Sequence, residues 1–128
     1  MTGSALPRAL VVDPDPDTRL FYKTALEPFT AGISEAEDGA EALGRALCNQ
    51  PALIVTETTL PRVDGFELCV LLRRDPLTAR AGIVVVTGAA SPSVTSRAVA
   101  AGADAVLAKP CGRDELLATV YHVCRRTR

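Results

Sequence analysis

The sequence predicts an α/β domain in which five parallel strands alternate with five helices in a doubly wound, three-layer sandwich. Two observations predict it. Short aliphatic runs are bounded by polar or turn residues and lack the polar alternation of a half-exposed strand, which is typical of parallel strands buried on both faces. A segment with helical signals follows each run, and right-handed crossovers then place helices on both faces of the sheet. The length of 128 residues suits one domain.

Four strands are predicted from continuous aliphatic character, although the last of them is weak. A fifth candidate contains only Ile33 as a strongly strand-forming residue, so the regular spacing of the surrounding elements carries its assignment. In chain order the five candidates are residues 10–12, 32–36, 53–55, 83–86 and 105–107.

The predicted helices have recognisable start and stop signals. Asp15 is placed to cap the first helix, with Pro16 at its first position. Asp38 and Asp64 each precede a glutamate by three residues, which is typical of a capping box. Gly102 closes the fourth helix. The expected helices cover residues 16 to about 27, those following 38 and 64, 92–101, and a last one from about 112.

Composition excludes several classes of protein. With 14 Lys plus Arg against 15 Asp plus Glu, the net charge of −1 gives no electrostatic case for nucleic acid or an anionic membrane as the main partner. No apolar run is long enough to span a membrane, and the first residues do not resemble a signal peptide. We therefore expect a cytoplasmic protein with reduced cysteines in core or boundary positions, at 48, 69, 111 and 124.

Polar residues end four of the predicted strands. Asp13, Glu57, Thr87 and Lys109 follow or end the first, third, fourth and fifth strands. Ligands of open α/β sheets bind beyond the carboxyl ends of the strands. We therefore expect these carboxylates, the hydroxyl and the ammonium group to meet in one crevice.

Four segments of the chain resemble the receiver domain of bacterial two-component response regulators: VVDPDPD, TETTLPRVDG, VVVTGA and GADAVLAKP. The resemblance implies a flavodoxin-like (βα)5 fold with strand order 2-1-3-4-5. It also implies a receiver domain at residues 8–125, an N-terminal extension at 1–7 and a tail at 126–128. Receivers of this kind transfer a phosphoryl group from a histidine kinase to an aspartate that ends the third strand. Two acids after the first strand hold Mg²⁺, and a hydroxyl and a lysine bind the phosphoryl oxygens.

Thr87 and Lys109 match the family pattern, and the resemblance implies a cis peptide bond between Lys109 and the proline that follows. Three other positions depart from the pattern. Glu57 stands at the phosphoacceptor position, Pro14 replaces the second acid of the metal pair after Asp13, and Val106 replaces the aromatic switch residue. The resemblance therefore predicts a degenerate receiver with no catalytic residue and no cofactor. Mg²⁺ binding at Asp13 is expected to be weak or absent.

Some roles stay open at the level of sequence. Glu57 can hold a fixed state resembling the activated one, or it can form an ion pair with Lys109 that closes the pocket. Asp15 and Asp17 can restore a divalent site, although a cap and a first-turn acid are simpler roles for them. His122, the only histidine, lies on the last predicted helix and has no acid–base partner in the sequence.

The predicted function is that of a stand-alone, non-enzymatic signalling module of a two-component or phosphorelay system, independent of phosphorylation. It would dock another signalling protein: a histidine kinase, an output protein or a receiver dimer partner. No direct contact with nucleic acid or membrane is expected. The alternative is a functional phosphoacceptor with an unconventional acidic site, and a transcriptional regulator would need a DNA-binding module outside these residues. The docking face expected from the fourth helix, fifth strand and fifth helix includes Val94, Arg97, Val99, Val106, Arg113 and Leu117.

Overall fold

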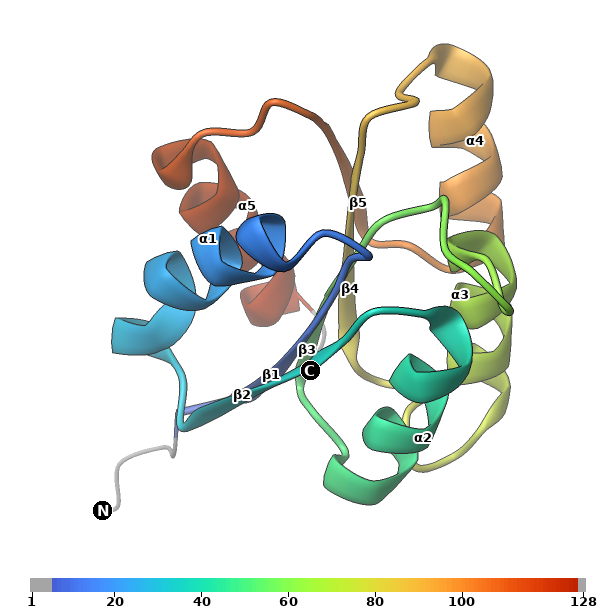
Figure 1. Ribbon diagram of the computed structural model, residues 1–128. Coiled ribbons are helices and arrows are strands. Elements are labelled where there is room, and N and C mark those ends of the chain that lie inside the picture. Colours follow the sequence, from blue (N-terminus) through green and yellow to red (C-terminus); the bar gives the residue numbers. More distant parts are fainter. Residues whose placement is uncertain (1–5, 127–128) are drawn as a thin grey trace.

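A five-stranded parallel sheet lies between two layers of helices in the computed structural model, which describes residues 6–126 (Figure 1). The sheet order is β2-β1-β3-β4-β5, and all neighbouring strands are parallel. This arrangement confirms the predicted fold and strand order, including the weakly predicted second strand, which lies at one edge. The strands are β1 (Arg8–Val12), β2 (Gly32–Ala36), β3 (Leu53–Thr56), β4 (Gly82–Thr87) and β5 (Ala105–Ala108).

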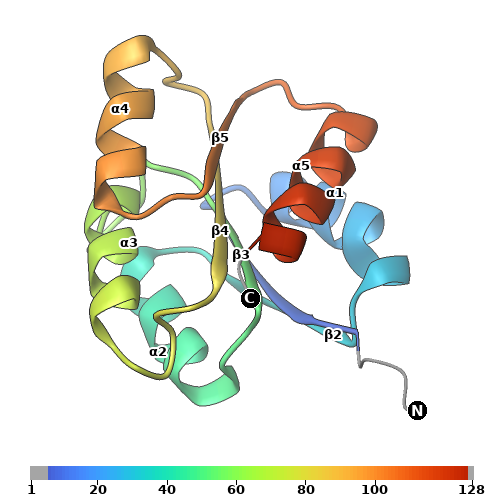
Figure 2. The same ribbon diagram turned by 180° about the vertical axis from the view of Figure 1, so that it is seen from behind.

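The helices divide unequally between the two faces of the sheet. In Figures 1 and 2, α1 and α5 cover one face, whereas α2, α3 and α4 cover the other. None of the helices within residues 6–126 is both long and apolar enough to cross a membrane. The helices are α1 (Pro16–Leu26), a short 3-10 turn η1 (Glu27–Phe29), α2 (Gly39–Asn49), α3 (Gly65–Arg74), α4 (Pro92–Ala101) and α5 (Arg113–Arg126).

Helix starts follow the predicted caps. The carboxylates of Asp15, Asp38 and Asp64 each accept a hydrogen bond from a backbone N–H of the first turn. The capping box of α2 differs from the prediction, because the Glu41 carboxylate accepts from the N–H of Glu37, one residue before the cap. The cap residues were therefore predictable, but the return contact depended on the turn after β2.

The predicted domain boundaries differ slightly from the ends of the elements. The last helix continues through Arg126, which the prediction assigned to the tail. Residues 127–128 and most of the predicted extension, residues 1–5, lie outside the described residues.

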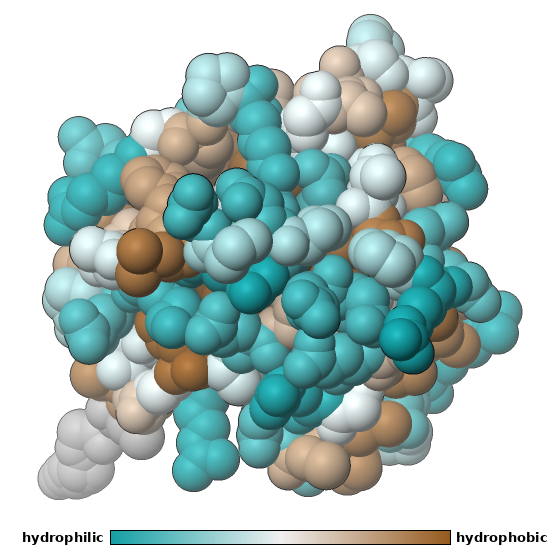
Figure 3. Space-filling view, in the orientation of Figure 1, coloured by the Kyte–Doolittle hydropathy of each residue, from teal (hydrophilic) through white to brown (hydrophobic). Residues whose placement is uncertain are grey.

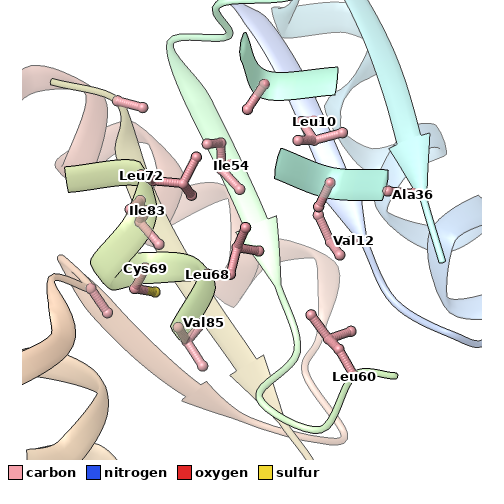
Figure 4. Close-up of a cluster of buried hydrophobic side chains, with 14 of the residues drawn as sticks. Leu10, Val12, Ala36, Ile54, Leu60, Leu68, Cys69, Leu72, Ile83 and Val85 are labelled. Carbon is pink, nitrogen blue, oxygen red and sulfur yellow. The ribbon is translucent and has the colours of Figure 1, made fainter. Parts of the chain in front are cut away.

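Each face of the sheet has its own hydrophobic core. Along the central strands, Leu10, Ile54 and Ile83 point toward α2, α3 and α4 (Figure 4). Their neighbours Val11 and Val84 pack on the other side, against α1 and α5. All of these side chains are fully buried, which explains why the strands read as continuous aliphatic runs.

The cysteines occupy different environments. Cys69 is buried in the core beneath α3, and Cys111 and Cys124 are half-buried. The expectation of a core or boundary position is wrong for Cys48, which is exposed. Position 48 lies on the outer side of α2, because the inner side of this helix is made by Ala42 and Ala46.

Candidate functional site

The carboxyl edge of the sheet brings together three of the predicted site residues. Lys109 Nζ lies 2.8 Å from Asp13 Oδ2 and 2.9 Å from Glu57 Oε1. Asp13 and Glu57 are only 2% and 7% exposed. The structure therefore contains the Glu57–Lys109 ion pair considered from the sequence, but Asp13 shares the same ammonium group. We call Asp13, Glu57 and Lys109 the site cluster.

Local packing fixes the position of Glu57. Its backbone N–H donates to the Val12 carbonyl at 3.2 Å, so the chain leaves β3 still tied to β1. Gly65 at the start of α3 lies directly against the Glu57 carbonyl, where a Cβ atom would collide with backbone. Its N–H donates to the Thr58 carbonyl at 2.8 Å. Only glycine lets α3 begin this close to the end of β3.

Both carboxylate oxygens of Glu57 accept several hydrogen bonds. Oε1 accepts from the Gly88 N–H at 3.2 Å, in addition to its contact with Lys109. Oε2 accepts from the backbone N–H of Thr58 at 2.6 Å and from its hydroxyl at 3.1 Å. These contacts hold the carboxylate between the loops that follow β3, β4 and β5.

Thr87 reaches Glu57 through a second hydroxyl. The Oγ1 atoms of Thr87 and Thr58 are 2.9 Å apart, and the Ala89 N–H donates to Thr87 Oγ1 at 3.0 Å. Because the Thr58 hydroxyl donates its proton to Glu57, Thr87 must donate to Thr58. Both hydroxyls are buried, so one continuous chain of hydrogen bonds connects the end of β4 to the carboxylate after β3.

Glu57 and Lys109 stay charged despite their burial. Burial by itself disfavours the Glu57 carboxylate anion, but hydrogen bonds from Lys109 and the Thr58 N–H, together with the lysine charge, outweigh it and lower the pKa to about 2. For Lys109, burial again opposes the charge, whereas contacts with Asp13 and Glu57 raise the pKa above its ordinary value. Glu57 is therefore an anion at neutral pH and Lys109 a cation.

The residues after β1 do not add a further acid to the cluster. Pro14 is exposed and carries no side-chain oxygen. Asp15 caps α1 by accepting from the Thr18 N–H at 3.2 Å and the Thr18 hydroxyl at 2.6 Å, and Asp17 is exposed in the first turn. Within residues 6–126, no group of three or more His, Cys, Asp or Glu side chains could hold a metal ion.

The other predicted residues lie around the site rather than in it. Val106 is half-buried in β5 and packs against the core beneath α2, α3 and α4. The Lys109–Pro110 peptide bond is cis. Cys111 and Lys109 line a cleft of about 510 Å³ beside α1. His122 is exposed on α5, and within the described residues it forms no hydrogen bond or ion pair with the site cluster.

The six residues of the expected docking face do not form one surface. Arg97 stacks on Phe66 of α3, with 3.9 Å between the guanidinium carbon and the ring centroid, and so faces away from α5. Leu117 lines a groove beside η1 instead of the β5 edge. Val99 is 54% exposed. The expectation was wrong for Arg97 and Leu117, because sequence spacing does not tell which neighbour each helix side meets.

Sequence reasoning missed two contributors to the site, the Thr58 hydroxyl and the Gly88 N–H. The signal for Thr58 is its place in the polar run after β3, directly beside Glu57. The Gly88 N–H carries no side-chain signal at all. Hydrophilic residues cover most of the centre of the face seen in Figure 3, and hydrophobic ones show at its left, over α1, and again along its right side.

A parallel sheet with acids after β1 and β3, a threonine ending β4 and a lysine after β5 defines a receiver-type signalling domain. The chain belongs to the family described as the response regulator receiver domain, which matches residues 9–121. Receiver domains are signalling modules of two-component systems.

Similar proteins are found among both curated sequences and solved structures. The chain is 35% identical over 122 residues to the "DNA-binding dual master transcriptional regulator RpaA" of Synechocystis sp., covering 95% of this chain and 51% of that protein. It is 38% identical over 122 residues to "Response regulator MprA" of a Mycobacterium species, with 94% and 51% covered. A putative response regulator structure from Chloroflexus aurantiacus has a TM-score of 0.88 at 29% identity, covering 96% of this chain and all of that one. The chemotaxis protein CheY4 of Vibrio cholerae has a TM-score of 0.86 at 28% identity, with 93% and 99% covered.

The chain spans about half the length of these two curated relatives. One of them is named a DNA-binding regulator, so the similarity does not support the expectation that nucleic acid is excluded as a partner.

Proposed function

We propose that this receiver domain signals without phosphorylation at position 57 and acts by docking another signalling protein. The observation that carries the proposal is the Glu57 carboxylate itself. Its two oxygens accept from Lys109, Gly88 and Thr58, so the group that stands at the phosphoacceptor position is already fully bonded.

Glu57 is poorly suited to attack a phosphodonor. Its side chain is one methylene longer than aspartate, which moves the carboxylate by more than about 1 Å in a reaction where such a displacement can cost about 100-fold in rate. The pKa of about 2 also makes it a weakly basic nucleophile. Attack would require the carboxylate to leave hydrogen bonds that it holds at 2.6–3.2 Å.

The site also fits a divalent cation poorly. Asp13 would be the carboxylate ligand, but its Oδ1 accepts from the Asp15 N–H at 2.9 Å and its Oδ2 contacts Lys109. Pro14 offers no oxygen at the next position, and Mg²⁺ requires near-octahedral oxygen ligands. The lysine ammonium neutralises the two carboxylates that a cation would otherwise bring together, which supports weak or absent Mg²⁺ binding.

The hydroxyl chain supports a single fixed state of the site. Thr87 is joined to Glu57 through Thr58, so the carboxylate holds the end of β4 in place with no phosphoryl group. Val106 has no aromatic ring that could change position with Thr87. We propose that the domain presents one constant surface to its partner, which would be a kinase, an output protein or a second receiver.

Intact mass after incubation with acetyl phosphate and Mg²⁺ tests this proposal. We expect no phosphoryl adduct on the wild-type chain. The matched variant combines Glu57→Asp with Pro14→Asp and is expected to acquire one adduct, which hydroxylamine removes as it does an acyl phosphate. A stoichiometric, hydroxylamine-labile adduct on the wild type would show a working phosphoacceptor and overturn the proposal. Repeating the incubation with the single variant Asp13→Asn would then test whether Asp13 accepts the phosphoryl group.

A further inference from the structure

A cleft lies next to the site cluster, between the first half of α1 and the segment that follows β5. It has a volume of about 510 Å³, which is within the range of small-molecule sites in proteins. In Figure 1 the connection from β5 to α5 lies at the same end of the molecule as the start of α1. We call this space the α1–β5 cleft. Its lining includes Asp17, Phe21, Tyr22, Val86, Lys109 and Pro110.

Tyr22 presents an unpaired hydroxyl to this cleft. The residue is only 2% exposed, yet no hydrogen bond within residues 6–126 involves its hydroxyl. No fully enclosed side-chain oxygen or nitrogen of these residues lacks a partner, so the Tyr22 hydroxyl must be accessible from the cleft that the residue lines. A nearly buried hydroxyl without a protein partner can bond only to what enters the cleft. The cleft therefore contains a donor that the fold itself does not use.

The Tyr22 hydroxyl stays protonated at neutral pH. Burial raises the pKa of Tyr22 above its ordinary value, and nearby negative charges, that of Asp13 first, raise the pKa further. Tyr22 is therefore a neutral group that can donate to an oxygen or nitrogen acceptor.

The walls of the cleft are largely apolar. Phe21 is 37% exposed, and its ring centroid lies 5.9 Å from that of Tyr22, with 60° between the two ring planes. Val86 of β4 and Pro110 after β5 complete the apolar lining. A flat aromatic ring fits such walls, because aromatic rings gain from tilted or offset contacts with one another.

The charges at the cleft favour a cation over an anion. Lys109 contacts both Asp13 and Glu57, so its charge is already offset within the site cluster. Asp17 is exposed, and its carboxylate forms no hydrogen bond or ion pair within the described part of the chain. The Asp17 carboxylate would repel an anion and attract an ammonium group.

We propose that the α1–β5 cleft binds a small arylalkylamine whose ring carries an oxygen. The ring would lie against Phe21, the oxygen would accept from the Tyr22 hydroxyl, and the ammonium group would pair with Asp17. This site is separate from the function proposed above, because neither Tyr22 nor Asp17 belongs to the site cluster.

Tyramine and two matched compounds provide the first measurement. Phenethylamine lacks the ring oxygen, and phloretic acid has a carboxylate in place of the amine. Binding is measured by amide chemical shifts in titrations at low salt. We expect tyramine to bind with a dissociation constant of a few millimolar, as a compound of this size should. Phenethylamine should bind about fivefold more weakly. Phloretic acid should give no saturable shifts, and the shifts with tyramine should be confined to α1 and the segment after β5.

Two variants test the hydroxyl and the carboxylate separately. Tyr22→Phe should remove the preference for tyramine over phenethylamine and leave the melting temperature unchanged, because the hydroxyl has no partner in the described part of the protein. Asp17→Asn should weaken binding of both amines by about threefold. Tyr121→Phe and Glu67→Gln are the matched controls. Both residues are exposed and lie outside the cleft, so neither change should affect binding.

Three outcomes would overturn the proposal. Absence of saturable shifts with tyramine would show that the cleft does not bind this class of compound. Equal affinities of the wild type for tyramine and phenethylamine, or for tyramine and phloretic acid, would remove the role of the hydroxyl or of the carboxylate. A Tyr22→Phe variant that melts at a lower temperature and still prefers tyramine would assign the hydroxyl to the stability of the fold. The acetyl phosphate experiment affects none of these results, so the two proposals can fail separately.

Discussion

A half-buried cation lies at the carboxyl ends of the strands and another at their amino ends, but the two cations bind different kinds of group. At the carboxyl edge, Lys109 contacts the carboxylates of Asp13 and Glu57. At the amino edge, Arg73 donates to the carbonyls of Ala79, Ala81 and Gly102 and pairs with Asp104 at 2.9 Å. Lysine therefore joins side chains, whereas arginine joins loops.

The Lys109 contacts belong to a site that substitution can alter, whereas the Arg73 contacts hold the fold together. The Asp104 carboxylate also accepts from the Ile83 N–H at 2.8 Å, so Arg73 and Asp104 together connect the ends of α3 and α4 to the start of β4. Backbone carbonyls cannot be removed by substitution. Losing Arg73 would leave several of them without a donor, whereas losing Lys109 would leave two titratable carboxylates.

The largest expected effect is that of Arg73→Ala. We expect a loss of about 3 kcal/mol in the free energy of unfolding, because the half-buried carbonyls that Arg73 binds, and Asp104, lose this partner. Urea unfolding at neutral pH measures it. Arg74→Ala is the matched control, since Arg74 is exposed and its removal should cost less than about 0.5 kcal/mol. Similar losses for the two variants would show that the Arg73 contacts do not hold the loops.

Lys109→Met is expected to cost less, about 2 kcal/mol at pH 7. The lysine side chain is 28% exposed, so solvent screens part of the repulsion between the remaining carboxylates. The loss should shrink at pH 3, where carboxylates can take up protons. Lys23→Met is the control, because Lys23 and Glu35 form an ion pair with both side chains 38% exposed. A loss that does not change with pH would contradict the role of the two carboxylates.

The pH dependence of stability should differ between the wild type and Glu57→Gln. The native pKa of Glu57 is about 2, below the ordinary value of 4.5. Its contribution is therefore present above pH 4.5 and is lost as the pH falls toward 2. With solvent screening, this amounts to about 1–2 kcal/mol. Between pH 5 and pH 2, the free energy of unfolding should fall more steeply with decreasing pH for the wild type than for Glu57→Gln. Equal slopes for the two proteins would show that the pKa of Glu57 is not depressed.

The smallest expected effect concerns Mg²⁺. Glu57→Asp with Pro14→Asp supplies the acids that the site lacks and should give calorimetric binding with millimolar affinity. At 10 mM Mg²⁺ such binding would stabilise the variant by about 1 kcal/mol, whereas the wild type should change little. Absence of binding by the double variant would show that residues 13, 14 and 57 do not occupy the metal positions of the family.

Local sequence patterns predicted some features of the fold and the site but not others. Strand ends, helix caps and the residues at positions 13, 57, 87 and 109 were predictable, because they depend on short-range patterns and on the common edge of a parallel sheet. The Arg73 contacts were not, since Arg73 and Gly102 are 29 residues apart in the chain. The spacing of residues along the fourth helix also did not predict that Arg97 would stack on Phe66 of α3.

The sequence by itself determined the class of the protein and the chemistry available at its site. Alternating buried strands and capped helices specify the sheet. The sequence also states directly which residue types stand at the three departing positions, Glu57, Pro14 and Val106. Only the tertiary structure decided how those groups are paired. Lys109 contacts Asp13, which is 96 residues away in the chain. Thr58, which follows β3, joins Glu57 to Thr87 at the end of the neighbouring strand β4. Such contacts depend on strand order and loop geometry, which place distant groups within hydrogen-bonding distance and which no local pattern encodes.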